Sequence, residues 1–270
     1  MNLLMAGFPL TVHNRSRQRE QPLLAAGATA AGSPAEAAAA ADVLCLCVSD
    51  GPDVEAVLFG AGGAAAGLRP GSVVIDFSTI DPAISRSLAQ RLERQGVAYL
   101  DAPVTGGTEG ARAGTLSVLV GGAAADLERV RPLLEVVGGC ITHLGSVGAG
   151  QQAKAVNQVL VAGSYVAVAE AMALGQRLGL PMAAVRRALV SGAAGSWALE
   201  HRAEAMLEGC FPLGFKLSLH RKDLAIALAA AAAEGLALPI TAQVAAIEDS
   251  LIAAGFGGED VAALARWFRE

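Results

Sequence analysis

The chain has 270 residues, of which 53% are hydrophobic, and its 20 basic and 25 acidic residues give a net charge of −5. This length allows one or two domains with a substantial core. There is no basic tract or stripe of the kind that binds nucleic acid. The most apolar window, residues 159–178, carries Glu170 and lacks a polybasic flank, so we expect a buried helix and no membrane association.

The start of the chain is typical of the second half of a nucleotide-binding unit. Residues 2–7 are predicted as the last turn of an apolar helix closed by Gly7, and residues 8–13 as a short strand that ends in the polar and basic run 14–17. Such a helix normally follows a first strand and a glycine-rich turn. We expect that first half to lie upstream of Met1, which makes the predicted unit N-terminally truncated.

Short apolar segments alternate with helix-like segments up to residue 145. The apolar segments have few polar interruptions, as expected when helices cover both faces of a sheet. This alternation predicts an α/β fold with a doubly wound, mostly parallel sheet. The expected strands cover residues 42–48, 72–77, 97–100, 115–120 and 141–144, and the expected helices cover residues 53–59, 82–95 and 124–137.

The rest of the chain is predicted to be all helical. The expected helices cover residues 151–178, 182–190, 196–207, 220–234, 242–254 and 259–268. We therefore expect a dinucleotide-binding domain at residues 1–145, incomplete at its N-terminus, and an all-α domain at residues 146–270. The long helix 151–178 joins the two.

The cysteines and histidines do not show the spacing of metal ligands, and we predict no metal site. Cys45 and Cys47 are two residues apart in an expected strand, so we expect both to pack on one face as small hydrophobic residues. Reduced thiols, together with a start that lacks the features of a secretory signal, favour a cytoplasmic location.

Polar residues follow two of the expected strands, where ligands of open α/β sheets bind. Asn14 and Arg15 lie where such folds meet the adenine ribose, and a neutral residue followed by arginine favours a 2′-phosphate. A solvated basic turn is an equally weighted alternative. The run Asp76-Phe77-Ser78-Thr79, taken by itself, fits an ordinary turn or helix cap better than a ligand site.

A more specific signal is the run Thr105-Gly106-Gly107 after the strand 97–100. It exposes a hydroxyl group and adjacent backbone N–H groups where glycine allows a small anion to approach. A plain glycine turn is the alternative interpretation.

The long helix carries the residues best suited to proton transfer. Lys154, Asn157 and Gln158 lie three and four residues apart on one face, among apolar neighbours. We expect desolvation to lower the pKa of such a lysine toward a useful range, and the amides to orient a substrate. A lysine that extends to solvent at a helix start is the alternative. Lys222 either reaches the same cleft or is a solvated charge.

Taken in order, these stretches resemble the β-hydroxyacid dehydrogenase family, which includes 3-hydroxyisobutyrate dehydrogenases and tartronate semialdehyde reductases. The resemblance covers the whole chain and is nearer to the reductases. It rests on NLLMAG, VHNRS, DFSTIDP, DAPVTGG, GTLSVLVGG, GAGQQAKAVNQ and GFKLSLHRKDL. It implies an oxidoreductase that transfers a hydride between a nicotinamide cofactor, NADP with NAD possible, and a small hydroxy acid or its semialdehyde.

The resemblance also implies roles for individual residues. Lys154 matches the family's catalytic lysine, a general acid and base, and Asn157 matches a catalytic residue that orients the substrate. Thr105, Gly106 and Gly107 match the substrate-carboxylate loop, although many members have serine at the first position. The positions that match cofactor contacts are Asn14, Arg15, Ser16, Thr79 and Lys222. The helical domain is implied to bind substrate and to form a homo-oligomer, a dimer or tetramer.

The glycine-rich turn that normally holds the pyrophosphate is not found in residues 1–270. This favours a different class of function as the alternative, namely a non-catalytic family member that keeps the fold for binding or assembly. Retention of Lys154 with Asn157 favours the enzyme. Lys154 also argues against an imine reductase of related fold, in which the lysine is normally replaced.

Overall fold

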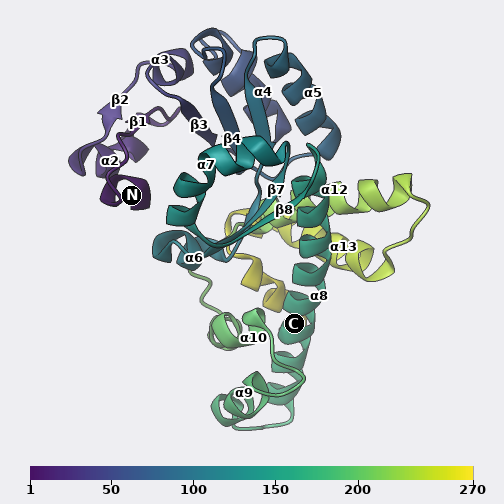
Figure 1. Cartoon of the computed structure of the whole chain (residues 1–270). Helices are drawn as coiled ribbons and strands as arrows, with labels where there is room; N and C mark the ends of the chain where they lie inside the picture. Colours follow the sequence, from purple (N-terminus) through teal and green to yellow (C-terminus); the bar gives the residue numbers. More distant parts are fainter. Residues whose placement is uncertain (270) are drawn as a thin grey trace. The chain divides into compact units, whose positions relative to one another are not determined.

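The computed structural model describes residues 1–269. The chain forms two compact units, Met1–Lys154 and Ala155–Glu270, and each is considered by itself below. The boundary predicted at residues 145 and 146 stays a prediction. The long helix α8 (Ala149–Arg177) begins in the first unit and continues into the second (Figure 1).

The first unit contains a six-stranded mixed sheet in the order β3-β4-β5-β7-β6, with β8 paired to β7. The pairs β3–β4, β4–β5 and β7–β8 are parallel, whereas β7 runs antiparallel to β5 and β6. The strands are β3 (Val43–Leu46), β4 (Val73–Asp76), β5 (Ala98–Asp101), β6 (Val104–Thr105), β7 (Leu116–Gly121) and β8 (Gly138–Gly145). The predicted α/β fold is confirmed.

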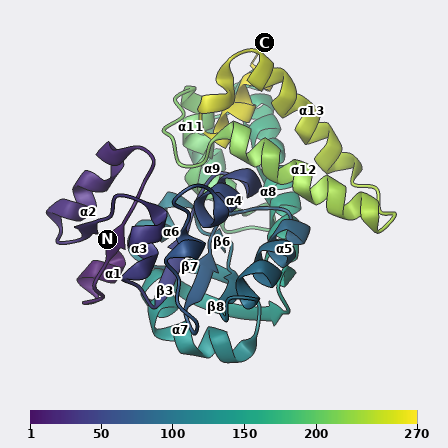
Figure 2. The same ribbon diagram turned by 90° about the horizontal axis from the view of Figure 1, so that it is seen from above.

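Helices cover both faces of this sheet, as the continuous apolar strands require. Val74 and Tyr99 face a core formed with α4 (Gly51–Phe59) and α5 (Pro82–Glu93). Residues one position away along the same strands, including Val73 and Leu100, face a second core against α7 (Ala124–Val137). Figure 2 shows the strands between α7 on one side and α4 and α5 on the other.

The first forty residues form smaller elements: α1 (Asn2–Met5), β1 (Thr11–Val12), η1 (Arg17–Glu20), α2 (Gln21–Ala25), β2 (Thr29–Ala30) and α3 (Pro34–Ala39). β1 and β2 pair in parallel as a separate two-stranded sheet. Within residues 1–269, β3 pairs only with β4 and is an edge strand of the larger sheet.

The prediction that Cys45 and Cys47 pack in the core is wrong, because both side chains are exposed. They alternate along the chain with Leu46, which is buried against α4 and α5. The opposite face of the sheet is covered by α7 over β4, β5 and β7, and this cover does not enclose the two thiols at the edge strand.

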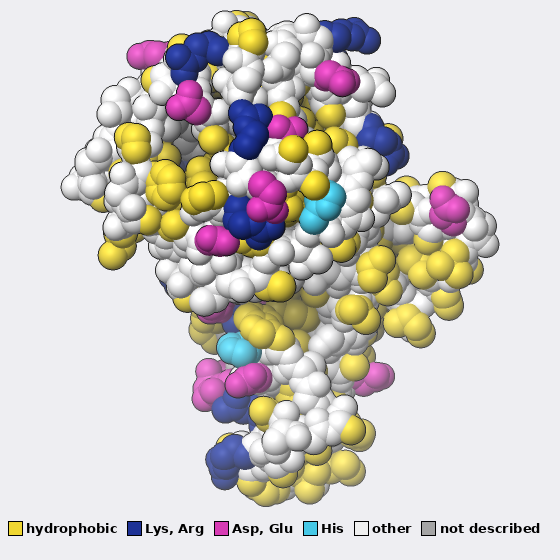
Figure 3. All heavy atoms as spheres, viewed as in Figure 1, with side chains coloured by type: hydrophobic (Ala, Val, Ile, Leu, Met, Phe, Trp, Pro, Cys, Tyr) yellow, Lys and Arg dark blue, Asp and Glu magenta, His cyan; other side chains and the backbone are white. Residues whose placement is uncertain are grey.

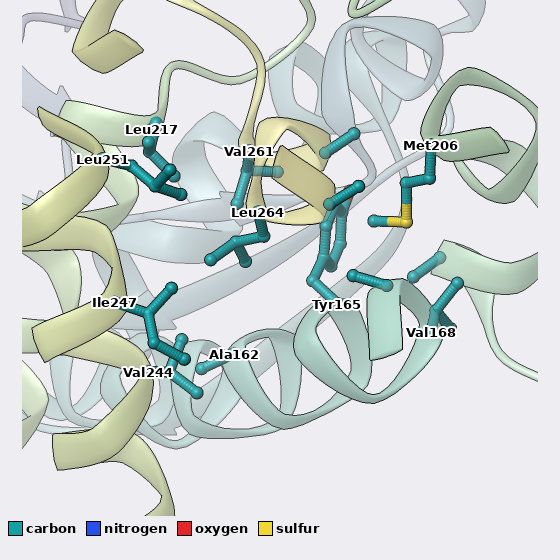
Figure 4. Packing of buried hydrophobic residues seen from close by; sticks show 14 of the residues in the cluster. Ala162, Tyr165, Val168, Met206, Leu217, Val244, Ile247, Leu251, Val261 and Leu264 are labelled. Carbon is teal, nitrogen blue, oxygen red and sulfur yellow. The ribbon is translucent and has the colours of Figure 1, made fainter. Parts of the chain in front are cut away.

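The second unit is all helical, as predicted. After α8 come α9 (Met182–Val190), α10 (Trp197–His201), α11 (Ala203–Glu208), α12 (Leu217–Ala233), α13 (Pro239–Ala253) and the 3₁₀ segments η3 (Phe256–Gly258) and η4 (Val261–Phe268). The helix expected at residues 196–207 is two short helices that meet at Arg202. Figure 4 shows its core, in which Tyr165 of α8, Ile247 of α13 and Leu264 of η4 pack together.

By length and composition alone, α8 is a helix that could cross a membrane. Its composition also suits a core helix. Ala162, Tyr165, Val168 and Met172 lie on one side of α8 in the core of the second unit.

Candidate active site

Lys154 lies on the buried face of α8 together with Gln151 and Gln158, three residues before it and four after it. Lys154 is only 8% exposed. Its Nζ atom donates a hydrogen bond of 2.8 Å to the carbonyl oxygen of Val104. This contact places the ammonium group beside Thr105, the next residue of β6.

Asp101, at the end of β5, fixes the start of α8. Its Oδ1 accepts a hydrogen bond from the backbone N–H of Gly148, and its Oδ2 accepts one from Gln151, at 2.7 and 2.9 Å. Burial raises the pKa of the Asp101 carboxyl group, and these hydrogen bonds oppose that rise. Because Asp101 is joined to the first turn of α8, it sets the position from which Lys154 extends.

Gln151 holds the loop after β4. Its Nε2 donates to the carbonyl oxygen of Ser78 at 2.8 Å, and its Oε1 accepts from the backbone N–H of Ile80 at 3.1 Å. The residue between these two contacts is Thr79. Asp76 accepts a further hydrogen bond from the N–H of Ser78. Ser78, just after β4, is therefore bonded both to Asp76 of that strand and to Gln151 of α8.

The run Thr105-Gly106-Gly107 joins β6 to α6 (Gly107–Ala113). Gly106 has φ of +130° and Gly107 has φ of +66°, conformations that residues with a side chain rarely adopt. Thr105 is half-buried and paired in register with Ser117 of β7. The backbone therefore turns sharply directly after the carbonyl group that holds Lys154.

The turn after β1 carries three of the predicted cofactor residues, Asn14, Arg15 and Ser16. The Arg15 side chain is 89% exposed, and its Nη1 atom lies 3.7 Å from Oδ1 of Asp53. Glu20, to which no sequence pattern pointed, accepts hydrogen bonds from the backbone N–H of Asn14 and from Arg17. Since Glu20 is buried and paired with Arg17, it does not present an unpaired carboxylate at this turn.

Within the second unit, the structure joins Asn157 and Lys222 through two residues. These are Gln158, whose amide was expected to orient a substrate, and Asp223, which was not a predicted site residue. Asn157 Nδ2 donates to Gln158 Oε1, and Gln158 Nε2 donates to Asp223 Oδ2, both at 2.7 Å. Asp223 Oδ1 lies 3.0 Å from Lys222 Nζ. The helix α12 thus presents an ion pair whose carboxylate is bonded to α8.

The predicted site residues therefore fall into local groups. Lys154 is joined to the Thr105 loop, Thr79 lies in the loop held by Gln151, and Asn157 is linked to Lys222. The helical spacing from Lys154 identified Gln158 in the sequence, and the same signal could have identified Gln151. Asp101 gave no such signal, because its partners lie 47 and 50 residues later in the chain.

Comparison with known proteins decides the family. The NAD binding domain of 6-phosphogluconate dehydrogenase matches residues 1–145, and the NAD-binding domain of NADP-dependent 3-hydroxyisobutyrate dehydrogenase matches residues 148–268. The chain is 41% identical to 2-hydroxy-3-oxopropionate reductase of Escherichia coli K12 over 242 residues, which cover 90% of this chain and 82% of that protein. The chain belongs to the β-hydroxyacid dehydrogenase family.

Solved structures agree with this assignment. The crystal structure of 3-hydroxyisobutyrate dehydrogenase from Salmonella typhimurium has a TM-score of 0.91 and 32% identity, covering 98% of this chain and 93% of that one. Psf3 in complex with NADP⁺ and 2-OPP also has a TM-score of 0.91, with 28% identity, and the match covers 98% of this chain and 94% of that one. The protein is thus an NAD(P)-dependent oxidoreductase of hydroxy acids.

The residues present fit a dinucleotide of this kind. Ligands of open α/β sheets bind at the carboxyl ends of parallel strands, and the loop held by Gln151 lies at that end of β4. Arg15 adds an exposed guanidinium, a group that forms strong hydrogen bonds with phosphate.

Proposed function

We propose that this enzyme reduces a short 3-oxo acid of the 2-hydroxy-3-oxopropionate type, or oxidises a 3-hydroxyisobutyrate-type hydroxy acid in reverse, with Lys154 as general acid and base. The observation that carries the proposal is the buried ammonium group of Lys154, held against Val104 beside the Thr105 loop. The likeness to 2-hydroxy-3-oxopropionate reductase supports the substrate class.

Lys154 suits proton transfer because the Val104 carbonyl fixes the position of its buried ammonium group. An ammonium group has three N–H donors, and the Val104 carbonyl accepts a hydrogen bond from one of them. A bound nicotinamide would supply the hydride for reduction of the carbonyl carbon. In reduction, Lys154 gives a proton from Nζ to the carbonyl oxygen of the substrate, and in oxidation it takes that proton back.

We propose that Thr105, Gly106 and Gly107 hold the substrate carboxylate. The positive φ angles of both glycines turn their backbone away from the strand, and consecutive N–H groups in such turns bind anions. Asn157, three residues after Lys154 on α8, is proposed to orient the substrate through its amide.

Asn14, Arg15, Ser16, Thr79 and Lys222 are proposed as cofactor contacts. The exposed Arg15 and the pairing of Glu20 with Arg17 support NADP over NAD, because no unpaired carboxylate is described at this turn to repel a 2′-phosphate. The similar Psf3 structure, a complex with NADP⁺, supports the same preference. We propose residues 1–145 as the dinucleotide-binding domain and residues 146–270 as the substrate and dimerisation domain.

We also propose a homo-oligomer, a dimer or tetramer, in the cytoplasm. Val156, Leu160 and Leu174 on one face of α8 are 65%, 70% and 61% exposed. A groove of about 440 Å³ follows this helix, lined in part by Gly163 and Ile240. Figure 3 shows hydrophobic side chains gathered over the α12–α13 end of the second unit. Sedimentation velocity tests the proposal: a monomer at micromolar concentration contradicts it, and Leu160→Glu should weaken a dimer.

Steady-state kinetics tests the proposed reaction. Purified full chain is assayed with NADPH against 2-hydroxy-3-oxopropionate and 2-methyl-3-oxopropionate, and with NADP⁺ against the corresponding hydroxy acids. Turnover of at least one pair that is lost in Lys154→Met supports the proposal. Turnover confined to imines, or unchanged in Lys154→Met, contradicts it.

A further inference from the structure

Asp223 is a buried carboxylate that links α12 to α8 inside the second unit. It is 3% exposed, and its Oδ2 accepts the 2.7 Å hydrogen bond from Gln158 Nε2. Gln158 is itself 1% exposed, so neither group exchanges its partner for water without opening the packing between the helices.

The chemistry of this carboxylate fixes the direction of two amides. An ionised carboxylate only accepts hydrogen bonds, so Gln158 must turn its NH₂ end toward Asp223. Its carbonyl end then faces the next side chain, and it accepts the 2.7 Å hydrogen bond from Asn157 Nδ2. The NH₂ end of Asn157 is thereby drawn toward Gln158.

Because Nδ2 of Asn157 is bonded to Gln158, the carbonyl oxygen of Asn157 points away from Gln158 and can accept a hydrogen bond from another group. Asn157 is only partly buried, whereas Gln158 is buried, so part of Asn157 is open to solvent. An amide that was free to flip would present NH₂ as readily as C=O, and would accept and donate equally. With its direction fixed, Asn157 offers a carbonyl acceptor and one remaining N–H.

We propose that Asp223 and Gln158 are positioning residues that make Asn157 a hydrogen-bond acceptor for a substrate hydroxyl group. The enzyme then prefers 3-oxo acids that carry a hydroxyl at carbon 2 over those that carry hydrogen there. This inference rests on the proposed function, in which Asn157 contacts the substrate. A site built to bond a hydroxyl discriminates strongly against the analogue that lacks it, because its own polar group is left unpaired.

The test compares kcat/KM for 2-hydroxy-3-oxopropionate with kcat/KM for 3-oxopropionate, which lacks the 2-hydroxyl group. One hydrogen bond corresponds to a preference of about tenfold. Gln158→Leu removes both hydrogen bonds between Asn157 and Asp223. Asp223→Asn allows the direction of both bonds to reverse, because an asparagine amide can either accept from Gln158 or donate to it. Both should bring the ratio close to one, chiefly by raising KM for the hydroxylated substrate. The ratio is the readout because any effect of Asp223 on Lys222 acts on both substrates alike.

Two matched variants separate positioning from general damage. Gln152→Leu makes the same change at an exposed position of α8 and should keep the wild-type ratio. Asp223→Glu keeps a carboxylate that only accepts, and should retain more of the preference than Asp223→Asn. An unchanged ratio in both Gln158→Leu and Asp223→Asn overturns the inference, as does a wild type that reduces both substrates equally. A wild type that reduces neither of them but turns over 2-methyl-3-oxopropionate also overturns the inference, whereas a wild type that turns over none of the three overturns the proposed function itself.

Discussion

Lys154 Nζ lies 2.8 Å from the carbonyl oxygen of Val104, a residue fifty positions earlier in the chain. The contact joins the first turns of α8 to β6 and sets the proposed acid beside the proposed carboxylate loop. The Val104 carbonyl accepts a hydrogen bond from one of the three N–H donors of the ammonium group, and this contact holds the lysine at the end of β6.

We expect Lys154→Met to lower kcat by about 10²–10⁴-fold, the usual loss when a general acid is removed. Methionine keeps an unbranched apolar side chain at this buried position, so the fold should persist. Stopped-flow absorbance of NADPH measures the chemical step, and fluorescence titration measures NADPH binding, which should not change. Lys216→Met, at an exposed lysine, is the control. Retention of most of kcat in Lys154→Met would remove this residue from the mechanism.

The packing of α8 on β5 predicts a second effect. A side chain on Gly150 would overlap the carbonyl oxygens of Leu119 and Asp101. Gly150→Ala should lower the free energy of unfolding by about 1–3 kcal/mol, the range found for overpacked cores. It should also lower kcat, since it displaces the helix turn that precedes Lys154. Urea unfolding measures the first effect. Gly258→Ala, whose added carbon meets nothing within 4 Å, should match wild type in both measurements.

Local signals predicted most of the elements but few of the contacts between them. The helix at residues 124–137 was predicted to the residue, because its apolar period is regular and Gly138 follows it. The helix α3 was missed, since the alanine-rich segment 34–39 has no alternation between apolar and polar residues. Cys45 was misplaced because a two-residue period shows which side chains share a face, and not whether a helix covers that face.

The same limit applies to the site. Lys154, Asn157 and the glycines after Thr105 carry local signals of residue type and spacing. The bonds of Asp101 to the start of α8 depend on how β5 and that helix meet, and no period within either segment encodes this. The carboxylate of Glu20 beside Asn14 was likewise missed, because η1 folds it back onto the turn.

Arg15 should determine the choice of cofactor. Its exposed guanidinium can bond a 2′-phosphate, and a hydrogen bond to a charged group contributes about 1.5–3 kcal/mol. Arg15→Ala should therefore lower kcat/KM for NADPH about tenfold or more while kcat/KM for NADH stays the same. Arg69→Ala, at another exposed arginine, is the control. A wild type that prefers NADH, with kcat/KM for each cofactor unchanged in Arg15→Ala, would show that the turn after β1 does not bind the 2′-phosphate.

The last prediction concerns the pH dependence of stability and follows from Asp76 at the end of β4. Burial raises the pKa of its carboxyl group above the ordinary value of about 3.9, and the nearby carboxylate of Asp101 adds to that rise. Between the ordinary and the raised pKa, the folded protein binds more protons than the unfolded chain. The free energy of unfolding therefore falls as pH rises through this window, and the loss is complete above the raised pKa.

Asp76→Asn should remove this loss while keeping both contacts. In the wild type, Asp76 Oδ1 accepts from the N–H of Ser78, and Asp76 Oδ2 accepts from the hydroxyl group of Tyr99. The Oδ1 of an asparagine can keep the first hydrogen bond, and its Nδ2 can reverse the second by donating to the Tyr99 oxygen. The difference in unfolding free energy, variant minus wild type, should grow in favour of the variant as pH rises from about 4, then level off. Urea unfolding between pH 4 and 8 measures it, with Asp42→Asn at an exposed carboxylate as the control. A difference that stays constant or declines with pH would mean that burial of this carboxylate does not oppose its ionisation.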